Sequence, residues 1–393
     1  MKKTISFIIC LTLVASVFAT NNSAIIKFLK GNISDKTSAV TNSSGTEAAL
    51  LSSKAMEFAL ETKEILGNDR DLEALAVAAV LSISPDYVKN ETNNKKLLLE
   101  SQLIQMFKKF SDSSIVQITI LSKLSYIDEY IPTENFTKLL NDFLKQANIL
   151  TVDKGVFEAA IKVLEGLGNN ETFLILYSFL SNENYSLYKD EIKSVLASLV
   201  PVSMNEIISL IHNEQDRTKI IILFSLIKDN PDISHNNLCE IAENILVESI
   251  LLLKNTENIN NEEIELQLDA LTILSENKLT RASSISISYF AIAKDLYEAS
   301  SLSATQFKTV IDALPNIAPI DSVNPLTNYL TTLNTIKEEH KEVNDEIILA
   351  VINALGAIGD KTAFDSLLAV SYLDYNDQIL QAARKALSGL RFN

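Results

Sequence analysis

The side chains best suited to metal binding are few and scattered along this chain. Its three histidines, His212, His235 and His340, lie in the contexts IHNE, SHNN and EHKE. Zinc sites usually take histidines from patterns such as H-x-x-H or combine them with cysteines, and neither arrangement occurs. We therefore expect these histidines at the surface or in turns, and we expect no metal site.

The residues that serve as nucleophiles or bind phosphate are equally isolated. Cys239 shares helical spacing with the apolar residues around it in NNLCEIAENIL, which predicts a buried thiol. No G-x-S-x-G motif is present, and Gly166-Leu167-Gly168 lacks the preceding strand of a phosphate-binding loop. The sequence thus offers no catalytic and no cofactor-binding residues, and we expect a protein that is not an enzyme and needs no cofactor.

Acidic residues cluster once, in NTENINNEEIELQLD at residues 255–269. Calcium loops place oxygen ligands at alternating positions and usually include a glycine. The four glutamates, Glu257, Glu262, Glu263 and Glu265, follow no such alternation, and the segment has no glycine. We predict a solvated loop between two helices.

The charge of the chain limits its partners. The formal net charge is −16, and lysines and arginines occur singly or in pairs. Nucleic-acid binding requires a basic surface that neutralises phosphates, and anionic membranes attract the same kind of surface. We therefore expect no nucleic-acid partner, and the negative charge is typical of a soluble protein.

The first 19 residues predict a secretory signal peptide. Lys2 and Lys3 precede an apolar run, Ile5 to Val14, that is short for a membrane span, and Val17-Phe18-Ala19 is typical of a cleavage site. An uncleaved anchor is the alternative. Cleavage would remove Cys10 and leave one cysteine, so no internal disulfide could form. We expect a bacterial protein in the periplasm or outside the cell, with no membrane span in the mature chain.

Composition predicts helices for the remainder. Only 9 glycines and 7 prolines occur among 393 residues, which leaves few residues that favour turns. Residues 20–47 are rich in Ser, Thr and Asn and predict a flexible leader, whereas the apolar residues from 48 to 393 recur with helical periodicity. The stretch 283–292 alternates like a strand, but we predict a helix because a lone strand would have nothing to pair with.

One unit of sequence recurs. Residues 351–370 match residues 160–179 after a shift of 191, and shifts of 32 and 41 align 345–358 with later and earlier helices. Gly168 and Gly359 mark helix ends, and Asp377 stands where a helix N-cap is expected. A pair of helices cannot bury its apolar face alone, but stacked neighbours can. The pattern predicts an all-α solenoid of stacked antiparallel helix pairs over 48–393.

This pattern resembles the HEAT-repeat family, in particular its short bacterial form. The resemblance is best over 345–390, good over 156–212 and 307–330, and faint over 50–130. It implies an armadillo-like superhelix that binds a protein or peptide. The family's usual Val-Arg start of the second helix is replaced by Ile347-Ile348 and Ile379-Leu380. Some members bind iron through His-Glu dipeptides, which this chain lacks. Armadillo and TPR arrays are alternatives, and the absence of tryptophan makes TPR the less favoured.

Four tyrosines near turns are candidate partner contacts: Tyr185, Tyr188, Tyr372 and Tyr375. Exposed tyrosines often anchor interfaces, although the same residues could pack between repeats. We predict a non-catalytic scaffold that binds a protein or peptide in the cell envelope. Two alternatives remain: a spacer or assembly factor without a dedicated ligand, and an enzyme with a cryptic site on a concave face.

Overall fold

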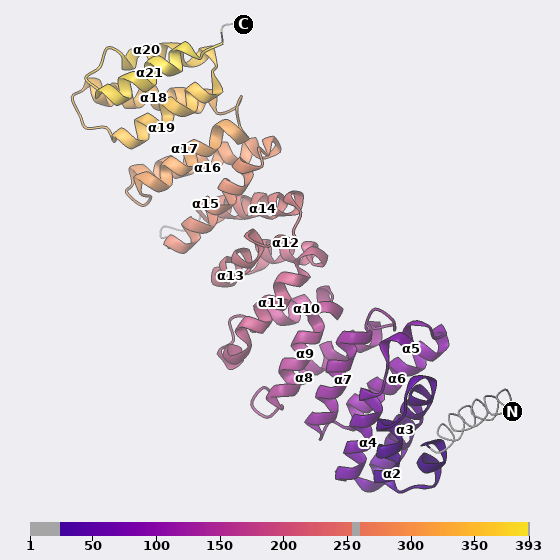
Figure 1. The fold of residues 1–393 in the computed structure, drawn as a ribbon. Helices are drawn as coiled ribbons and strands as arrows, with labels where there is room; N and C mark the ends of the chain where they lie inside the picture. The colour runs from indigo at the N-terminus through magenta and orange to yellow at the C-terminus, as the bar shows by residue number, and fades with distance from the viewer. Residues whose placement is uncertain (1–23, 254–259, 392–393) are drawn as a thin grey trace, which may run out of the picture. The chain divides into compact units, whose positions relative to one another are not determined.

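The computed structural model describes residues 24–253 and 260–391. Throughout these ranges the regular elements are helices, and one isolated β-bridge joins Asp360 to Arg391 (Figure 1). The predicted signal peptide lies outside the described residues. The chain divides into two compact units, which we call unit 1 (to Ser203) and unit 2 (from Met204). The sequence had predicted a single array from residue 48.

Unit 1 consists of two layers of helices. The elements are α2 (Ile33–Thr41), α3 (Gly45–Leu66), α4 (Arg70–Leu81), α5 (Pro85–Lys89), α6 (Asn93–Lys109), α7 (Ser114–Ile127), α8 (Glu134–Gln146), α9 (Lys154–Leu167), α10 (Asn170–Phe179), η1 (Glu183–Tyr188), α11 (Lys189–Leu199) and η2 (Val200–Val202). Helices α3, α6, α8 and α10 form one layer, and α2, α4, α7, α9 and α11 form the other. Their order in space follows their order along the chain.

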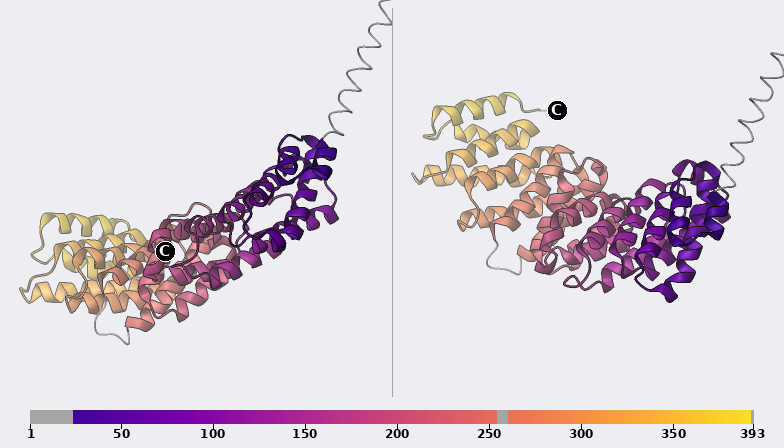
Figure 2. Two further views of the ribbon diagram at one scale, coloured as in Figure 1. Left: turned by 90° about the horizontal axis from the view of Figure 1, so that it is seen from below. Right: turned by 60° about the horizontal axis from the view of Figure 1, so that its bottom comes forward.

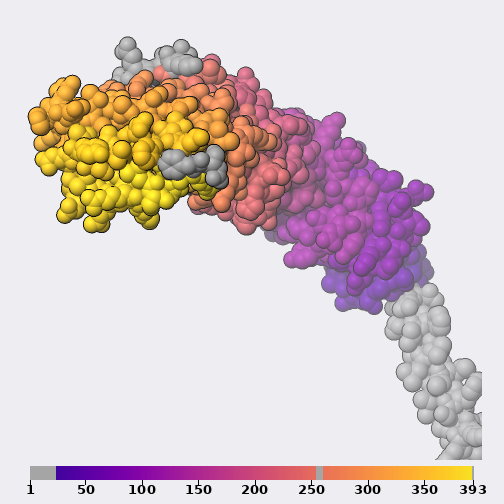
Figure 3. Space-filling model, turned by 90° about the horizontal axis from the view of Figure 1, so that it is seen from above, coloured from indigo at the N-terminus to yellow at the C-terminus, as the bar shows by residue number. Residues whose placement is uncertain are grey.

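Unit 2 repeats this arrangement. The elements are α12 (Met204–Asn213), α13 (Arg217–Lys228), α14 (His235–Leu253), α15 (Asn261–Glu276), η3 (Thr280–Ala282), α16 (Ser283–Glu298), α17 (Ala304–Ile317), α18 (Val323–Glu338), α19 (Asp345–Ile358), η4 (Lys361–Ala363), α20 (Phe364–Val370) and α21 (Asp377–Ser388). Even-numbered helices form one layer and odd-numbered helices the other. Figure 2 shows the helices of this unit, from pink to yellow, stacked on one another in chain order. The helices from orange to yellow present a continuous surface in Figure 3. Both units confirm the predicted all-α solenoid, and α16 confirms the helix predicted over 283–292.

The repeat offsets found in the sequence correspond to helix starts. Helices α9, α17, α19 and α21 follow the N-caps Asp153, Ser303, Asn344 and Asn376, which are separated by the shifts of 191, 41 and 32 residues. The predicted N-cap at Asp377 is wrong by one residue. The side chain of Asn376 accepts the hydrogen bond from the Ile379 amide at 3.0 Å, and Asp377 is the first residue of the helix.

The prediction of a flexible leader over residues 20–47 is wrong for residues 24–41, which are mostly helical. Residues 24–30 are helical, α2 occupies Ile33–Thr41, and Phe28, Ala39 and Val40 are buried. Several of the Ser and Thr residues that suggested flexibility lie within α2, where the Thr37 hydroxyl donates to the Ile33 carbonyl at 3.0 Å. The polar composition of this segment gave no sign of α2, in which Ala39 and Val40 are the buried apolar residues.

Gly359 ends α19 in a conformation that requires glycine. Its φ is +72°, and an added Cβ would lie 3.1 Å from the Gly389 carbonyl oxygen. We expect Gly359→Ala to destabilise unit 2 by roughly 1–2 kcal/mol, because a left-handed backbone costs other residues about that much. Chemical denaturation of the two proteins would measure the difference.

Gly166→Ala is the matched control, since Gly166 is exposed within α9 and an added Cβ meets only the Asp128 carboxylate at 3.5 Å. Alanine should stabilise that helix by about 0.5–1 kcal/mol. Equal effects of the two substitutions would contradict the assigned helix end.

Candidate functional site

Two of the four candidate tyrosines lie in the core of unit 1. Tyr185 stacks on Phe179 with ring centroids 3.9 Å apart, and Tyr188 packs on Phe157 at 4.9 Å. Both side chains are buried, and burial raises the pKa of each phenol. The prediction that Tyr185 and Tyr188 contact a partner is wrong, because η1 folds them back onto α9 and α10.

The two tyrosines of unit 2 differ from each other. Tyr375 is buried, and its hydroxyl donates to the Asn334 side-chain oxygen at 3.3 Å. Tyr375 is thus also a packing residue, and its assignment as a partner contact is wrong. Tyr372 is 79% exposed and remains accessible. The spacing of these residues placed them near turns but gave no information on which way their side chains point.

The histidines occupy separate positions. His212 on α12 contacts Glu248 at 2.5 Å and Asn244 at 2.9 Å, both on α14. His235 begins α14, and His340 has a positive φ of 60° just after α18. In the part of the chain that the structure describes, no group of three or more His, Cys, Asp or Glu side chains could hold a metal ion.

Cys239 is buried, as predicted, with 2% of its surface exposed. Burial also raises the pKa of its thiol. We expect iodoacetamide to modify Cys239 at least about 100-fold more slowly in the native protein than in denaturant, since alkylation requires an accessible thiolate. Mass spectrometry of the Cys239 peptide in the full chain would measure both rates. Rapid native labelling would place the thiol at the surface.

The described part of the acidic segment is helical from Asn261 onward and is not the predicted loop. Glu257 lies outside the described residues, but Glu262, Glu263 and Glu265 belong to α15, which begins because the Asn260 side chain accepts the Glu263 amide at 2.7 Å. Glu263 is buried and receives two hydrogen bonds from Arg217 on α13, at 2.8 and 3.1 Å. One member of the acidic cluster, Glu263, thus forms a buried ion pair between α13 and α15.

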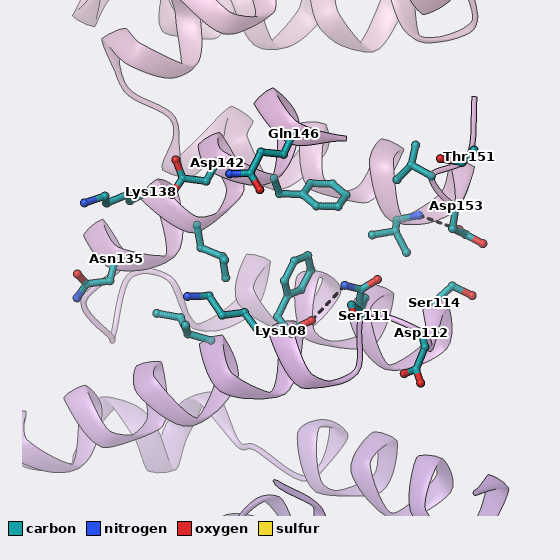
Figure 4. A pocket seen from close by; sticks show the side chains of 17 residues that line it. Lys108, Ser111, Asp112, Ser114, Asn135, Lys138, Asp142, Gln146, Thr151 and Asp153 are labelled. Atoms are coloured by element: carbon teal, nitrogen blue, oxygen red, sulfur yellow. Dashed lines mark hydrogen bonds between the residues drawn. The ribbon is translucent and has the colours of Figure 1, made fainter. Parts of the chain in front are cut away.

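A pocket of about 880 Å³ opens between two successive helix pairs of unit 1, α6–α7 and α8–α9. We call it the α6–α8 groove (Figure 4). Its volume falls within the range of ligand pockets, roughly 300–1,000 Å³. The lining side chains come mainly from the C-terminal half of α6, from α8, and from the starts of α7 and α9. Helices therefore position most of the groove, which favours a preformed site.

The floor of the α6–α8 groove is apolar. Phe107 and Phe143 meet edge to face with ring centroids 5.7 Å apart, and Phe107 also contacts Phe136 at 6.2 Å. The floor is extended by aliphatic side chains, namely Ile104, Leu139, Val152 and Val156. Phe107 is buried, whereas Phe143 and Leu139 are only partly covered. Part of the floor is thus open to an apolar group of a ligand.

The rim of the groove is polar and carries both signs of charge. Lys108, Lys138 and Asp142 line it without forming an ion pair to any described residue. At the other end, Asp112 pairs with Lys63 at 2.8 Å, and the Asp153 carboxylate accepts the Val156 amide at 3.1 Å to cap α9. An apolar floor with a polar rim is suited to binding.

Sequence reasoning did not identify this groove. Its residues come from α6, α7, α8 and α9, and the first two of these helices lie in the region where the repeat pattern is faint. The one available signal was a pair of phenylalanines, Phe107 and Phe143, each in the last two turns of a helix. That signal is equally typical of a closed core, so only the packing of the helix pairs reveals the opening.

No protein-family model matches the chain, and no curated protein matches it. A solved structure of an engineered protein is similar over 91% of this chain and 98% of its own, with 15% identity and a TM-score of 0.36. No single described helix is long and apolar enough to cross a membrane. One pair of helical segments, 183–202 and 204–213, is long and apolar enough when taken together, but the two segments are bent by 109°.

Proposed function

We propose that this protein is a non-catalytic binding scaffold that holds a segment of a protein or peptide in the α6–α8 groove. The observation that carries the proposal is a groove of about 880 Å³ with a partly open aromatic floor and unpaired charges on its rim. Apolar anchors surrounded by polar rims are typical of interfaces that bind with specificity. The resemblance to HEAT repeats also supports a binding role.

We further propose that the protein works outside the cytoplasm, in the periplasm or beyond the cell. The support is the sequence of residues 1–19, with Lys2, Lys3, a short apolar run and a cleavage-like ending. Fractionation of the native host, followed by N-terminal sequencing of the protein, tests this address. Recovery from the cytoplasm with residues 1–19 intact would contradict it.

Site-specific crosslinking in the native host tests the groove. Leu139, a lining residue, is replaced by p-benzoyl-phenylalanine, and Leu187, 70% exposed on η1, serves as the control position. We expect an ultraviolet-dependent adduct of one defined mass at position 139 only, and we expect Phe143→Ala to reduce its yield. Equal adducts at both positions, or none at position 139, would contradict binding in the groove.

A further inference from the structure

We propose that a second pocket of unit 1, enclosed by α3, α5 and α6, binds a small neutral aromatic molecule with one hydrogen-bonding group, as in the phenols. This pocket shares no lining residue with the α6–α8 groove, so the inference is independent of the proposed function. Its volume is about 210 Å³. An apolar cavity of roughly 150 Å³ already holds benzene, so a single ring with a small substituent fits.

Three helices form the walls of this pocket, which we call the α3–α6 pocket. Residues 49–56 of α3 and residues 95–102 of α6 supply most of the lining, and the remainder comes from α5 and the residues next to it. Helix α5 has five residues, begins with a proline and contacts both α3 and α7. Because packed helices set its walls, the pocket is formed before a ligand arrives.

The lining of the α3–α6 pocket is mostly apolar. Leu50 and Leu98 are about half exposed, so the pocket opens to solvent beside them. Met56 and Val88 are buried and line its deeper part. The Met56 thioether and the ring of Tyr87, which also lines the pocket, both make favourable contacts with aromatic rings. The lining therefore favours an aromatic ring over an aliphatic chain.

The charged groups of the lining already have partners inside the protein. Lys95 pairs with Glu91 at 2.8 Å, and Glu91 raises the pKa of the Tyr87 phenol because it accepts a hydrogen bond from that hydroxyl. The Lys96 Nζ donates to the Lys89 carbonyl, at the end of α5, at 3.2 Å. A charged ligand would have to break these contacts or lose its hydration without a counter-ion, so the pocket selects a neutral molecule.

One polar side chain of the pocket has hydrogen-bonding capacity to spare. Gln102 is buried, and its Nε2 and Oε1 both lie 3.4 Å from the Ser53 hydroxyl, beyond the about 2.9–3.0 Å that is usual. No closer partner of this amide lies in the described part of the chain. An amide has two N–H donors and an acceptor oxygen, and leaving them unmet in a buried position costs free energy. A hydroxyl both donates and accepts, so a phenol can bond the Gln102 amide.

Isothermal titration calorimetry of the full chain tests the pocket with p-cresol, toluene and 4-methylbenzoate. At pH 7 p-cresol is neutral, since phenols ionise near pH ~10. We expect p-cresol to bind about tenfold more tightly than toluene, because only its hydroxyl can bond the Gln102 amide, and about tenfold or more tightly than the charged benzoate. If p-cresol does not bind, or binds no better than either of the other two probes, the inference is overturned.

Two glutamine variants on α6 assign the preference to the pocket. Gln102→Leu should lose the preference for p-cresol and still bind toluene, which also shows that the variant is folded. Gln105→Leu is the matched control, since Gln105 is exposed three residues further along the same helix, and it should keep the preference. Equal loss of the preference in both variants would contradict a role for the Gln102 amide.

Photolabelling locates the ligand without any substitution. We expect 4-azidophenol, irradiated with the full chain and mapped by mass spectrometry, to label residues 49–102, and we expect p-cresol to compete. Adducts found mainly in residues 104–156, which line the α6–α8 groove, would overturn the site. If N-acetyltyrosinamide binds more tightly than p-cresol, the occupant is a tyrosine side chain of a partner protein, and a free small molecule is wrong.

Discussion

Phe157→Ala is expected to destabilise unit 1 by about 3–5 kcal/mol, the usual cost of removing a fully buried phenylalanine. The Phe157 side chain is fully buried and contacts the rings of Phe179, Tyr185 and Tyr188 at centroid distances of 6.5, 5.9 and 4.9 Å. Removing the ring leaves a cavity between α9, α10 and η1 that the fixed helices cannot close. Hydrogen exchange measured by mass spectrometry should show lost protection first in these three elements, since neighbouring repeats unfold with some independence.

Tyr372→Ala is the control for this prediction. Tyr372 is 79% exposed, and surface substitutions usually change stability by less than about 0.5 kcal/mol. A loss below about 1 kcal/mol for Phe157→Ala would mean that the aromatic cluster is not part of the core. The tyrosines Tyr185 and Tyr188 would then again be candidates for a partner surface.

Arg217→Met is expected to destabilise unit 2 by about 3 kcal/mol or more, because it leaves a buried carboxylate without its cation. Glu263 accepts two hydrogen bonds from Arg217 and a weaker one from Gln267, whose oxygen in turn accepts the Tyr289 hydroxyl at 2.9 Å. The network connects α13, α15 and α16 through the interior. Urea denaturation of the variant would measure the loss.

The double variant Arg217→Met, Glu263→Met should recover most of that loss, because an apolar pair of similar volume carries no desolvation cost. Lys228→Met provides the control on the same two helices. It breaks the partly exposed pair between Lys228 and Asp269, which should contribute no more than about 1 kcal/mol. If the double variant were less stable than Arg217→Met, Glu263 would have to make stabilising interactions other than its ion pair with Arg217.

The parts of the fold that sequence predicted are those that a local pattern determines. The helices α9, α19 and α21 share apolar spacing and end near Gly168, Gly359 and Gly389, so their starts and their stacking could be inferred. The helix α2 could not, because its Ser and Thr residues are equally typical of a flexible segment, and only contacts with α3 and α4 give it a buried face.

The candidate site could not be predicted from local sequence patterns, for a different reason. The spacing of Tyr375 and Tyr372 predicts a turn but not which ring faces Asn334. Likewise, the sequence around Phe107 and Phe143 is typical of core residues, and the groove beside them depends on how two helix pairs pack. Side-chain direction and the separation of neighbouring pairs are set by tertiary contacts.

The helix caps of unit 2 have a consequence for how the chain could be shortened. Helices α19 and α21 both begin with Asn followed by Asp, at Asn344-Asp345 and Asn376-Asp377. Excising residues 345–376 would join Asn344 directly to Asp377 and recreate the same junction. Ile379 then takes the register of Ile347 and Ala386 that of Ala354, but the exposed Arg384 takes the register of the fully buried Ile352. The helix start is thus repeated from one module to the next, and a shortened protein should fold only when Arg384 is also replaced by an apolar residue such as isoleucine.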